Sequence, residues 1–453
     1  MSVEGHPSDH FQDLLKIPSY PPPSLFLVVF SLLFQHHLPI TQCSSRQGTT
    51  MAAPLTPSQI AVVKSTAPVL KEHGETITSL FYKNMIDANP VLRNIFNEAN
   101  QIGGAQPRAL AAAVFAYAAY IDDLGKLSAA VERIAQKHVS LNVQPEQYAI
   151  VGKHLLEAVA TVLGDACTPE IAEAWTAAYA VLADIFINRE HQLYVAFENW
   201  TGWRRFKIQK KVPESKEITS FYLVPEDGVA LPKYSPGQYI SLQLYVPKLG
   251  IRQPRQYSLS DAPASDHYRI SVKKEAGKNI EIPGMISNML HNDFKEGDVV
   301  ELTHPAGEFF VNIEEETPLV LISAGVGITP MMSILNSAVA AGTSRKISLV
   351  HGAHSSEVRA FSDTLKHATE KPNVQALAFL STLREGEAQG VDYDFEGRVN
   401  LEKVDPERLF TDDATAQYYI CGPTSFMTDV QKYLLGRGVS EDRIHLEIFG
   451  VGN

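Results

Sequence analysis

The sequence predicts a multidomain fold with three domains: an all-α domain, an antiparallel β-barrel, and an α/β domain with a parallel sheet. Three stretches of different pattern predict it. Residues 52–198 carry helix signals without strand alternation, residues 199–313 carry short strands separated by Pro and Gly, and residues 314–453 alternate apolar runs with helices. The length of 453 residues agrees with this division, because domains hold about 100–200 residues each.

Composition limits the classes of function. The net charge of −12 argues against nucleic-acid binding, because a polyanion is bound by a basic surface. The three cysteines, Cys43, Cys167 and Cys421, form no CxxC pair and no zinc set, which fits a reducing compartment. We expect a cytoplasmic monomer that binds no nucleic acid and has no stable membrane span.

Residues 1–51 differ in composition from the rest of the chain. The apolar stretch 25–34 is too short to span a membrane, which takes about 20 residues. A secretory signal is disfavoured by the acidic residues before it, and a mitochondrial presequence by the single arginine, Arg46. We expect a disordered extension with Met51 as the functional start; mitochondrial targeting is the alternative for localisation.

Helix signals define the first domain. Thr56 and Pro57 predict a helix start, Pro145 opens another helix, and Thr168-Pro169 opens a long one that runs to about Phe197. The Ala-rich stretch 110–120 also lacks strand alternation. Helices without a heptad repeat predict a globin-like or another irregular helical domain.

One histidine of this domain lies on an apolar stripe. Leu127, Val131, Ile134, His138 and Leu141 follow spacings of three and four, which place His138 on the buried face of a helix. Taken alone, such a histidine is more often a hydrogen-bonded core residue than a ligand.

The barrel domain carries an Arg-Gln-Tyr-Ser motif. An arginine such as Arg255 can hold a pyrophosphate by paired hydrogen bonds, Tyr257 can pack on an aromatic ring system, and Ser258 can bond a ring atom. Cross-strand packing with a surface arginine explains the motif equally well. The predicted strands of this domain are 206–211, 218–224, 238–245, 255–259 and 268–272.

The third domain carries two glycine-bearing strand ends. The apolar run 319–323 leads into Gly325 and Gly327, which allow close approach of a pyrophosphate, and Pro330 suits the first helical turn. A tight turn without a ligand is the alternative, since GxG alone is weak. Cys421-Gly422-Pro423 follows the strand 418–421, at the edge where a parallel sheet binds ligands. The other predicted strands are 347–351 and 374–380.

The order of these motifs resembles a known family. From the barrel onward, the Arg255–Ser258 motif, Gly284–Ser287, Gly325–Pro330, Cys421–Pro423 and Phe449 resemble the ferredoxin–NADP reductase family. With the helical half, residues 52–453 resemble the flavohaemoglobins. The helical motifs that carry the resemblance are Leu80–Met85, Ile95–Asn97, Gln106–Leu110, Ile134–His138, Pro145–Tyr148 and Phe186–Glu190.

The resemblance implies a haem site in the globin domain. His138 would be the iron ligand, and Tyr148 and Glu190 would hydrogen-bond around it, which pushes electron density toward the iron. Tyr82 and Gln106 would donate hydrogen bonds to the oxygen ligand. The other implied residues are Phe96 and Leu110, which would pack the haem, and Lys137, near the haem edge and facing the flavin.

The resemblance also implies an FAD site on the barrel and an NAD(P)H site on the parallel domain. The FAD residues would be Tyr239, Arg255, Gln256, Tyr257, Ser258, Gly284, Ser287, Ile448, Phe449, Gly450 and Val451. The NAD(P)H residues would be Gly325, Val326, Gly327, Ile328, Thr329, Pro330, Cys421, Gly422 and Pro423. Two positions depart from the family pattern: Met289 stands where Trp is frequent, and Val451 where Pro is common.

The activity implied is that of a nitric oxide dioxygenase. NAD(P)H would reduce FAD, FAD would reduce the haem iron (haem b), and O2 bound there would oxidise nitric oxide to nitrate, which detoxifies nitric oxide. Two alternatives are a haem-based gas sensor and a reductase for a separate acceptor protein. The choice between NADH and NADPH stays open, because His354, Ser355, Ser356 and Arg359 include neither a clear acid for the ribose nor a basic cluster.

Overall fold

A computed structural model describes residues 52–96, 104–198, 200–277 and 284–449 of the chain. The predicted extension, residues 1–51, lies outside these ranges, and residues Leu55–Asn453 form one compact unit. Over the described ranges, no helix combines the length and apolar character needed to cross a bilayer.

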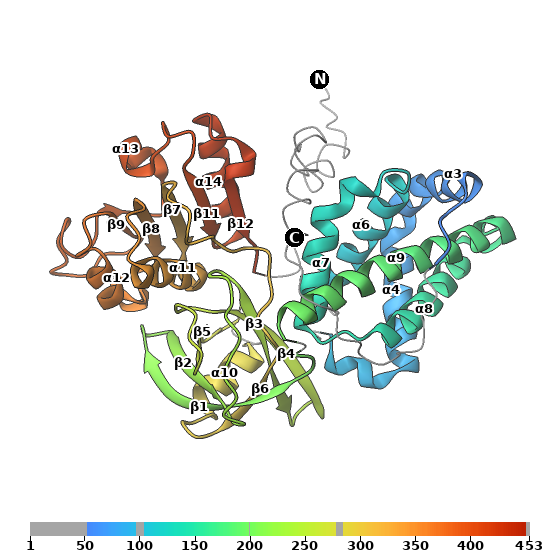
Figure 1. Cartoon of the computed structure of the whole chain (residues 1–453), viewed down its shortest axis with the longest axis horizontal. Coiled ribbons are helices and arrows are strands. Elements are labelled where there is room, and N and C mark those ends of the chain that lie inside the picture. The colour runs from blue at the N-terminus through green and yellow to red at the C-terminus, as the bar shows by residue number, and fades with distance from the viewer. Residues whose placement is uncertain (1–51, 97–103, 199, 278–283, 450–453) are drawn as a thin grey trace, which may run out of the picture. The chain divides into compact units, whose positions relative to one another are not determined.

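The first part of this unit is all-α, as predicted (Figure 1). Its helices are α3 (Pro57–Ser65), α4 (Ala67–Ala88), α6 (Ala105–Ala119), α7 (Ser128–Ser140), α8 (Pro145–Leu163) and α9 (Pro169–Ala196). The predicted starts are confirmed. The Thr56 hydroxyl accepts from the Gln59 backbone N–H in a capping box, and the Thr168 hydroxyl accepts from the N–H of Ile171. Prolines occupy the first positions of α3, α8 and α9, where their missing N–H costs no hydrogen bond.

Close contact between α8 and α9 depends on a glycine. A Cβ at Gly152 would lie 2.4 Å from Cε1 of Tyr179. The Tyr179 hydroxyl donates to the Tyr148 carbonyl oxygen at 2.6 Å, so the ring is held in place at both ends. The backbone of α8 can therefore approach α9 only because position 152 has no side chain.

The second part is a six-stranded antiparallel sheet in the order β4-β3-β6-β1-β2-β5. The edge strands β4 and β5 meet through a bridge between Leu259 and Ile270 and a hydrogen bond from the Ser260 N–H to the Arg269 carbonyl oxygen, so the sheet closes into a barrel. The bounds are β1 (Arg204–Pro213), β2 (Ile218–Pro225), β3 (Tyr239–Val246), β4 (Ile251–Ser258), β5 (Tyr268–Lys273), β6 (Val299–Leu302) and helix α10 (Met285–Asn292).

Strand β4 begins four residues before the predicted start at Arg255. Its first half contains Pro254, which pairs with Gln243 in the β3–β4 register. Proline is tolerated in an edge strand, because its missing N–H can face the side that has no neighbouring strand. The predicted end at Leu259 falls just beyond the strand, at the residue that bridges to β5.

The third part is a six-stranded parallel sheet in the order β10-β9-β8-β7-β11-β12, as the alternation of runs and helices predicts. The bounds are β7 (Leu319–Ala324), α11 (Ile328–Ala341), β8 (Ile347–Ala353), α12 (Ser362–Ala368), β9 (Val374–Leu380), β10 (Phe395–Glu396), α13 (Pro406–Leu409), β11 (Gln417–Cys421), α14 (Thr424–Gly436) and β12 (Ile444–Glu447).

Helices cover both faces of this sheet. Leu319 and Leu321 of β7 pack in a cluster with α11 and α12, while Val320 and Ile322 pack in a second cluster with α13 and α14. Successive side chains of a strand point to opposite faces, so a continuous apolar run serves both clusters. The strand order reverses between β7 and β11, and in such sheets ligands bind where the order reverses.

A buried histidine joins two strands at this edge. His351 of β8 lies beside Ser323 of β7, with 2.9 Å between its Nδ1 and the serine Oγ. Burial, followed by the positive charge of Arg359, lowers the pKa of His351 to about 4. The folded protein therefore holds this imidazole neutral, because its charged form would be poorly solvated.

We predict that Gly152→Ala destabilises the helical domain by about 1–3 kcal/mol, because the added methyl group collides with the Tyr179 ring. The matched control is Gly436→Ala at the end of α14, where a Cβ meets nothing within 4 Å. Thermal unfolding followed by circular dichroism should show a lower midpoint for the first variant only. Equal midpoints for both variants would show that the contact between α8 and α9 is not tight.

We predict that His351 makes stability fall as the pH is lowered. An unfolded histidine gains its proton near its ordinary pKa of 6.5, whereas the folded one resists until about 4, so acid favours the unfolded chain. Replacing His351 with Gln should remove about 2 kcal/mol of the stability lost between about pH 7 and pH 5.

Urea unfolding at the two pH values measures this loss. His367→Gln serves as the control, because the His367 side chain is 85% exposed. The prediction fails if both variants lose stability with acid as the wild type does.

Candidate active site

Three helices bring together His138, Tyr148 and Glu190. Nδ1 of His138, on α7, lies 2.8 Å from Oε1 of Glu190 on α9 and 2.9 Å from the hydroxyl of Tyr148 on α8. The Tyr148 hydroxyl donates to the same Glu190 oxygen at 2.5 Å. The carboxylate is buried, with a side-chain exposure of only 3%.

This network fixes the proton on the imidazole. Burial, and then the charge of Glu190, raise the pKa of Tyr148 far above its usual range, so its hydroxyl keeps its proton. An ionised carboxylate only accepts hydrogen bonds, so Nδ1 of His138 is the donor. With Nδ1 as the donor, Nε2 is the ring nitrogen left to offer a lone pair, and histidine binds metal ions through such a nitrogen.

A second group of side chains lies on α4, on α6 and just after the 3-10 turn Pro90–Asn94. The Tyr82 hydroxyl is hydrogen-bonded to the side chain of Gln106, and burial raises the pKa of Tyr82. The ring of Phe96 meets that of Tyr82 edge-on, with centroids 5.5 Å apart. Leu110 follows Gln106 by one helical turn, and Tyr82, Phe96 and Leu110 belong to one apolar cluster. These four predicted residues therefore lie together, with the polar groups of Tyr82 and Gln106 set among apolar side chains.

On the barrel, the β3–β4 register places Tyr239 opposite Ser258. The Ser258 hydroxyl is buried and finds no hydrogen-bond partner among the described residues. Arg255 donates to the carbonyl oxygen of its neighbour Pro254, burial lowers its pKa, and no acidic side chain among the described residues pairs with it. An orphaned hydroxyl and an uncompensated guanidinium on one strand fit a polar, anionic ligand.

Gln256 lies on the same strand but contacts helix α7. Its amide nitrogen donates to the Ser140 hydroxyl at 2.7 Å, and its oxygen accepts from the Lys137 ammonium. The predicted haem-edge lysine therefore contacts a predicted flavin-site residue.

Gly284 and Ser287 stand at the start of α10. The Ser287 hydroxyl donates to the Gly284 carbonyl oxygen at 3.0 Å and accepts from the Glu275 backbone N–H. A Cβ at Gly284 would lie 2.6 Å from Cβ of Glu275, so only glycine fits this turn. The main role visible for these two residues is to shape the turn.

The two glycine-bearing strand ends meet at the reversal of strand order. Gly325–Gly327 forms a tight turn between β7 and α11, and Gly325 has a φ of +57° with open space where a Cβ would be. A Cβ at Gly327 would lie 2.2 Å from the Cys421 carbonyl oxygen. Val326 is the middle residue of the turn. The other predicted residues of this edge are Ile328, Thr329 and Pro330, which begin α11, and Gly422 and Pro423, which lead into α14. The turn leaves room above Gly325 for a phosphate.

Cys421 itself is buried, and burial raises the pKa of its thiol well above the usual range. This thiol is therefore protonated at neutral pH and a weak nucleophile. Cys421 lies at the carboxyl end of β11, paired with Ser323 of β7, so it lines the carboxyl edge of the parallel sheet.

The two residues that follow β12 are exposed. Ile448 and Phe449 are exposed apolar residues, which suits side chains that cover a ligand. Gly450 and Val451, predicted to take part in the same site, lie outside the described residues.

Glu447 is a further candidate for the site that was not predicted from the sequence. It ends β12, opposite Cys421. Burial, and then the charge of Glu308, raise its pKa to about 8, while Lys137 acts in the opposite direction. Its position directly before the Ile448-Phe449 pair was a usable signal, but its proximity to Lys137 arises only in the folded chain.

Comparisons with known proteins agree with this arrangement. Residues 79–186 match the Globin family model and residues 321–432 match the model of the Oxidoreductase NAD-binding domain. The chain is 50% identical to a flavohemoprotein of Bordetella pertussis over 404 residues, which cover 88% of this chain and 99% of the relative. A flavohemoprotein of Rhizobium meliloti is 49% identical over 394 residues, 86% of this chain and 96% of that one.

Two solved structures are also similar. The crystal structure of a flavohemoglobin from Malassezia yamatoensis, with bound FAD and heme, aligns with a TM-score of 0.76 at 30% identity, over 87% of this chain and 100% of that one. The FAD/NAD-binding domain of a nitric oxide dioxygenase from Vibrio cholerae aligns with a TM-score of 0.50 at 38% identity, over 55% of this chain and 98% of that one. The likeness to whole flavohemoproteins spans both the helices and the two sheets, so this chain is an oxidoreductase that belongs to the flavohaemoglobin family.

Proposed function

We propose that this protein is a nitric oxide dioxygenase that uses NAD(P)H and O2 to convert nitric oxide to nitrate. The observation that carries the proposal is the hydrogen bond between Nδ1 of His138 and the buried Glu190 carboxylate. A histidine ligand that shares its proton with a carboxylate is a stronger electron donor, which favours oxygen activation over storage. The flavohemoprotein relatives and the nitric oxide dioxygenase of Vibrio cholerae support the same activity.

The donor sets fit haem, FAD and NAD(P)H. When bound, these groups supply hydride acceptance, division of the hydride's electron pair into single electrons, and an iron that binds O2. His138 would hold the iron through Nε2, while Tyr239, Arg255, Tyr257 and Ser258 would hold FAD. Gly325–Pro330 and Cys421–Pro423 would hold the pyrophosphate and nicotinamide portions of NAD(P)H.

The reaction balances with these components. Each nitrate forms from a nitric oxide, a dioxygen and a single electron, so the hydride of NAD(P)H serves two turnovers. The Tyr82 hydroxyl stays protonated because burial raises its pKa, and with Gln106 it would donate hydrogen bonds where negative charge develops on oxygen. Phe96 and Leu110 would exclude water there, and Lys137 would lie between the two redox groups.

We also propose a cellular compartment and an oligomeric state for the protein. The described cysteines, Cys167 and Cys421, are free thiols, which is consistent with a reducing compartment such as the cytoplasm. We propose that the protein acts as a monomer on small-molecule substrates and protects the cell against nitric oxide.

We predict that His138→Ala abolishes nitric oxide consumption while flavin reduction by NADH continues, because the substitution removes the proposed iron ligand and leaves the barrel intact. Stopped-flow spectroscopy with NADH, O2 and nitric oxide measures both steps. His73→Ala on α4, a half-exposed histidine, is the matched control. Undiminished consumption by His138→Ala would overturn the proposal.

We predict that Glu190→Gln slows nitric oxide consumption about 10–100-fold, because the amide keeps a hydrogen-bond acceptor but loses the charge that strengthens the histidine donor. Glu157→Gln is the matched control, since Glu157 pairs with His154 but its side chain is 53% exposed. Turnover at saturating NADH and the reduction potential of the iron should both change in the first variant alone. Wild-type turnover in Glu190→Gln would remove the role given to the carboxylate.

A further inference from the structure

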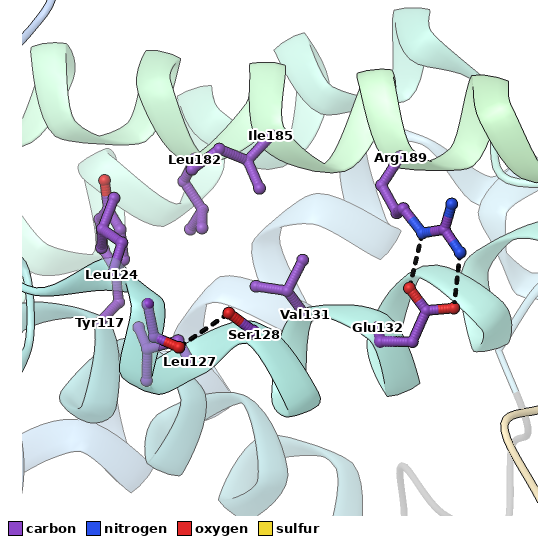
Figure 2. A pocket seen from close by; sticks show the side chains of 10 residues that line it. Tyr117, Leu124, Leu127, Ser128, Val131, Glu132, Leu182, Ile185 and Arg189 are labelled. Atoms are coloured by element: carbon purple, nitrogen blue, oxygen red, sulfur yellow. Dashed lines mark hydrogen bonds and ion pairs between the residues drawn. The ribbon is translucent and has the colours of Figure 1, made fainter. Parts of the chain in front are cut away.

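A cavity of about 430 Å³ that is partly open to solvent lies between α7 and α9, outside the residues proposed to hold haem. We call it the α7–α9 cavity. Figure 2 shows Leu182 and Ile185 projecting from α9 toward Val131 of α7, with Leu124 and Leu127 at one end. Its volume lies in the range of pockets that hold small organic ligands, about 300–1,000 Å³.

The polar groups around this cavity are already satisfied. The Tyr117 hydroxyl donates to the Ala178 carbonyl oxygen at 2.8 Å, and the Ser128 hydroxyl donates to the Gly125 carbonyl oxygen at 2.7 Å. Both hydroxyls spend their donor protons on backbone oxygens, so they offer an occupant of the cavity no free donor. The space between Val131, Leu182 and Ile185 therefore favours an apolar occupant.

The only charges in the lining neutralise each other. Arg189 donates two hydrogen bonds to the Glu132 carboxylate, at 2.6 and 2.9 Å, at the end of the cavity opposite Leu124 (Figure 2). A paired guanidinium gives little attraction to a second carboxylate, because a new anion would have to displace Glu132. The cavity thus fits an uncharged ligand better than a fatty acid or another anion.

The cavity lies between the two helices that carry His138 and Glu190. Val131 precedes His138 by seven residues, which is about two turns of the same helix. Ile185 precedes Glu190 by five residues on α9, and Arg189 is its direct neighbour. An occupant in contact with Val131 and Ile185 would set the separation of α7 and α9 close to the His138–Glu190 hydrogen bond.

We propose that the α7–α9 cavity binds a small, uncharged, apolar molecule and that its occupation alters the His138–Glu190 contact. The binding claim is independent of the proposed nitric oxide activity. The coupling claim rests on the part of that proposal that makes His138 the iron ligand. Occupation would act by changing how strongly Glu190 polarises the imidazole, and thereby the donor strength of the histidine.

Binding is tested with benzene as the probe and the haem- and flavin-loaded protein. Calorimetry should show saturable binding to the wild type and to Val195→Phe, a matched substitution at a position on α9 that is 51% exposed. In Val131→Phe and Ile185→Phe, whose rings fill the cavity, we expect the affinity to fall at least about tenfold. Absence of binding to the wild type, or equal affinity in all four proteins, would overturn the site.

A crystal of the wild-type protein under xenon pressure tests the location without any substitution, because xenon binds at apolar sites in proteins. We expect xenon between Val131 and Ile185. Benzoate serves as the charged counterpart of benzene, and it should bind at least about tenfold more weakly. Tighter binding of benzoate would show that Arg189 is available to anions and would contradict an uncharged ligand.

Coupling is tested by resonance Raman spectroscopy of the ferrous protein. The iron–histidine stretching band should shift when benzene is added to the wild type and to Val195→Phe, but not in Val131→Phe. An unchanged band at saturating benzene would overturn the coupling and leave the binding site standing. Absence of an iron–histidine band before benzene is added would instead refute the assignment of His138, so the two failures are distinguishable.

Discussion

The hydrogen bonds that Glu190 accepts from His138 and Tyr148 are the constraint on which the helical part depends. A carboxylate with 3% exposure is poorly solvated, and removing one partner of such a buried charged group costs about 3–5 kcal/mol. The two donors come from α7 and α8, and the acceptor from α9. One buried charge thus fixes the register of three helices and, at the same time, orients the imidazole.

The same helix carries the contacts to the barrel. Beside His138, α7 contributes Lys137 and Ser140 to the side chain of Gln256 on β4, and Gln136 accepts from the Gly307 backbone N–H at 2.9 Å. These contacts come from little more than one turn of the helix around the histidine. A shift of α7 would therefore disturb the proposed iron ligand and the proposed flavin strand together.

Features that depend on neighbouring residues could be predicted from the sequence. Contacts between segments far apart in the chain could not. Thr56, Pro145 and the turn at Gly325 act on their own neighbours, so the sequence alone located them. The closure of the barrel at Leu259 and the proximity of Glu447 to Lys137 join segments far apart in the chain. No spacing rule reports such contacts. The stripe through His138 predicted burial, but its partner Glu190, 52 residues away, came from the family resemblance.

The two glycine motifs are each weak evidence for a nucleotide site, but the fold brings them together, with Gly327 close to Cys421. Each glycine turn, taken separately, is compatible with an ordinary loop. Their contact at the reversal of strand order means that a side chain at position 327 would push β7 and β11 apart. The room above Gly325 is therefore a consequence of central sheet packing, not of a loose loop. A ligand edge built in this way is held by the same apolar clusters that stabilise the sheet, so its shape is set before any nucleotide binds.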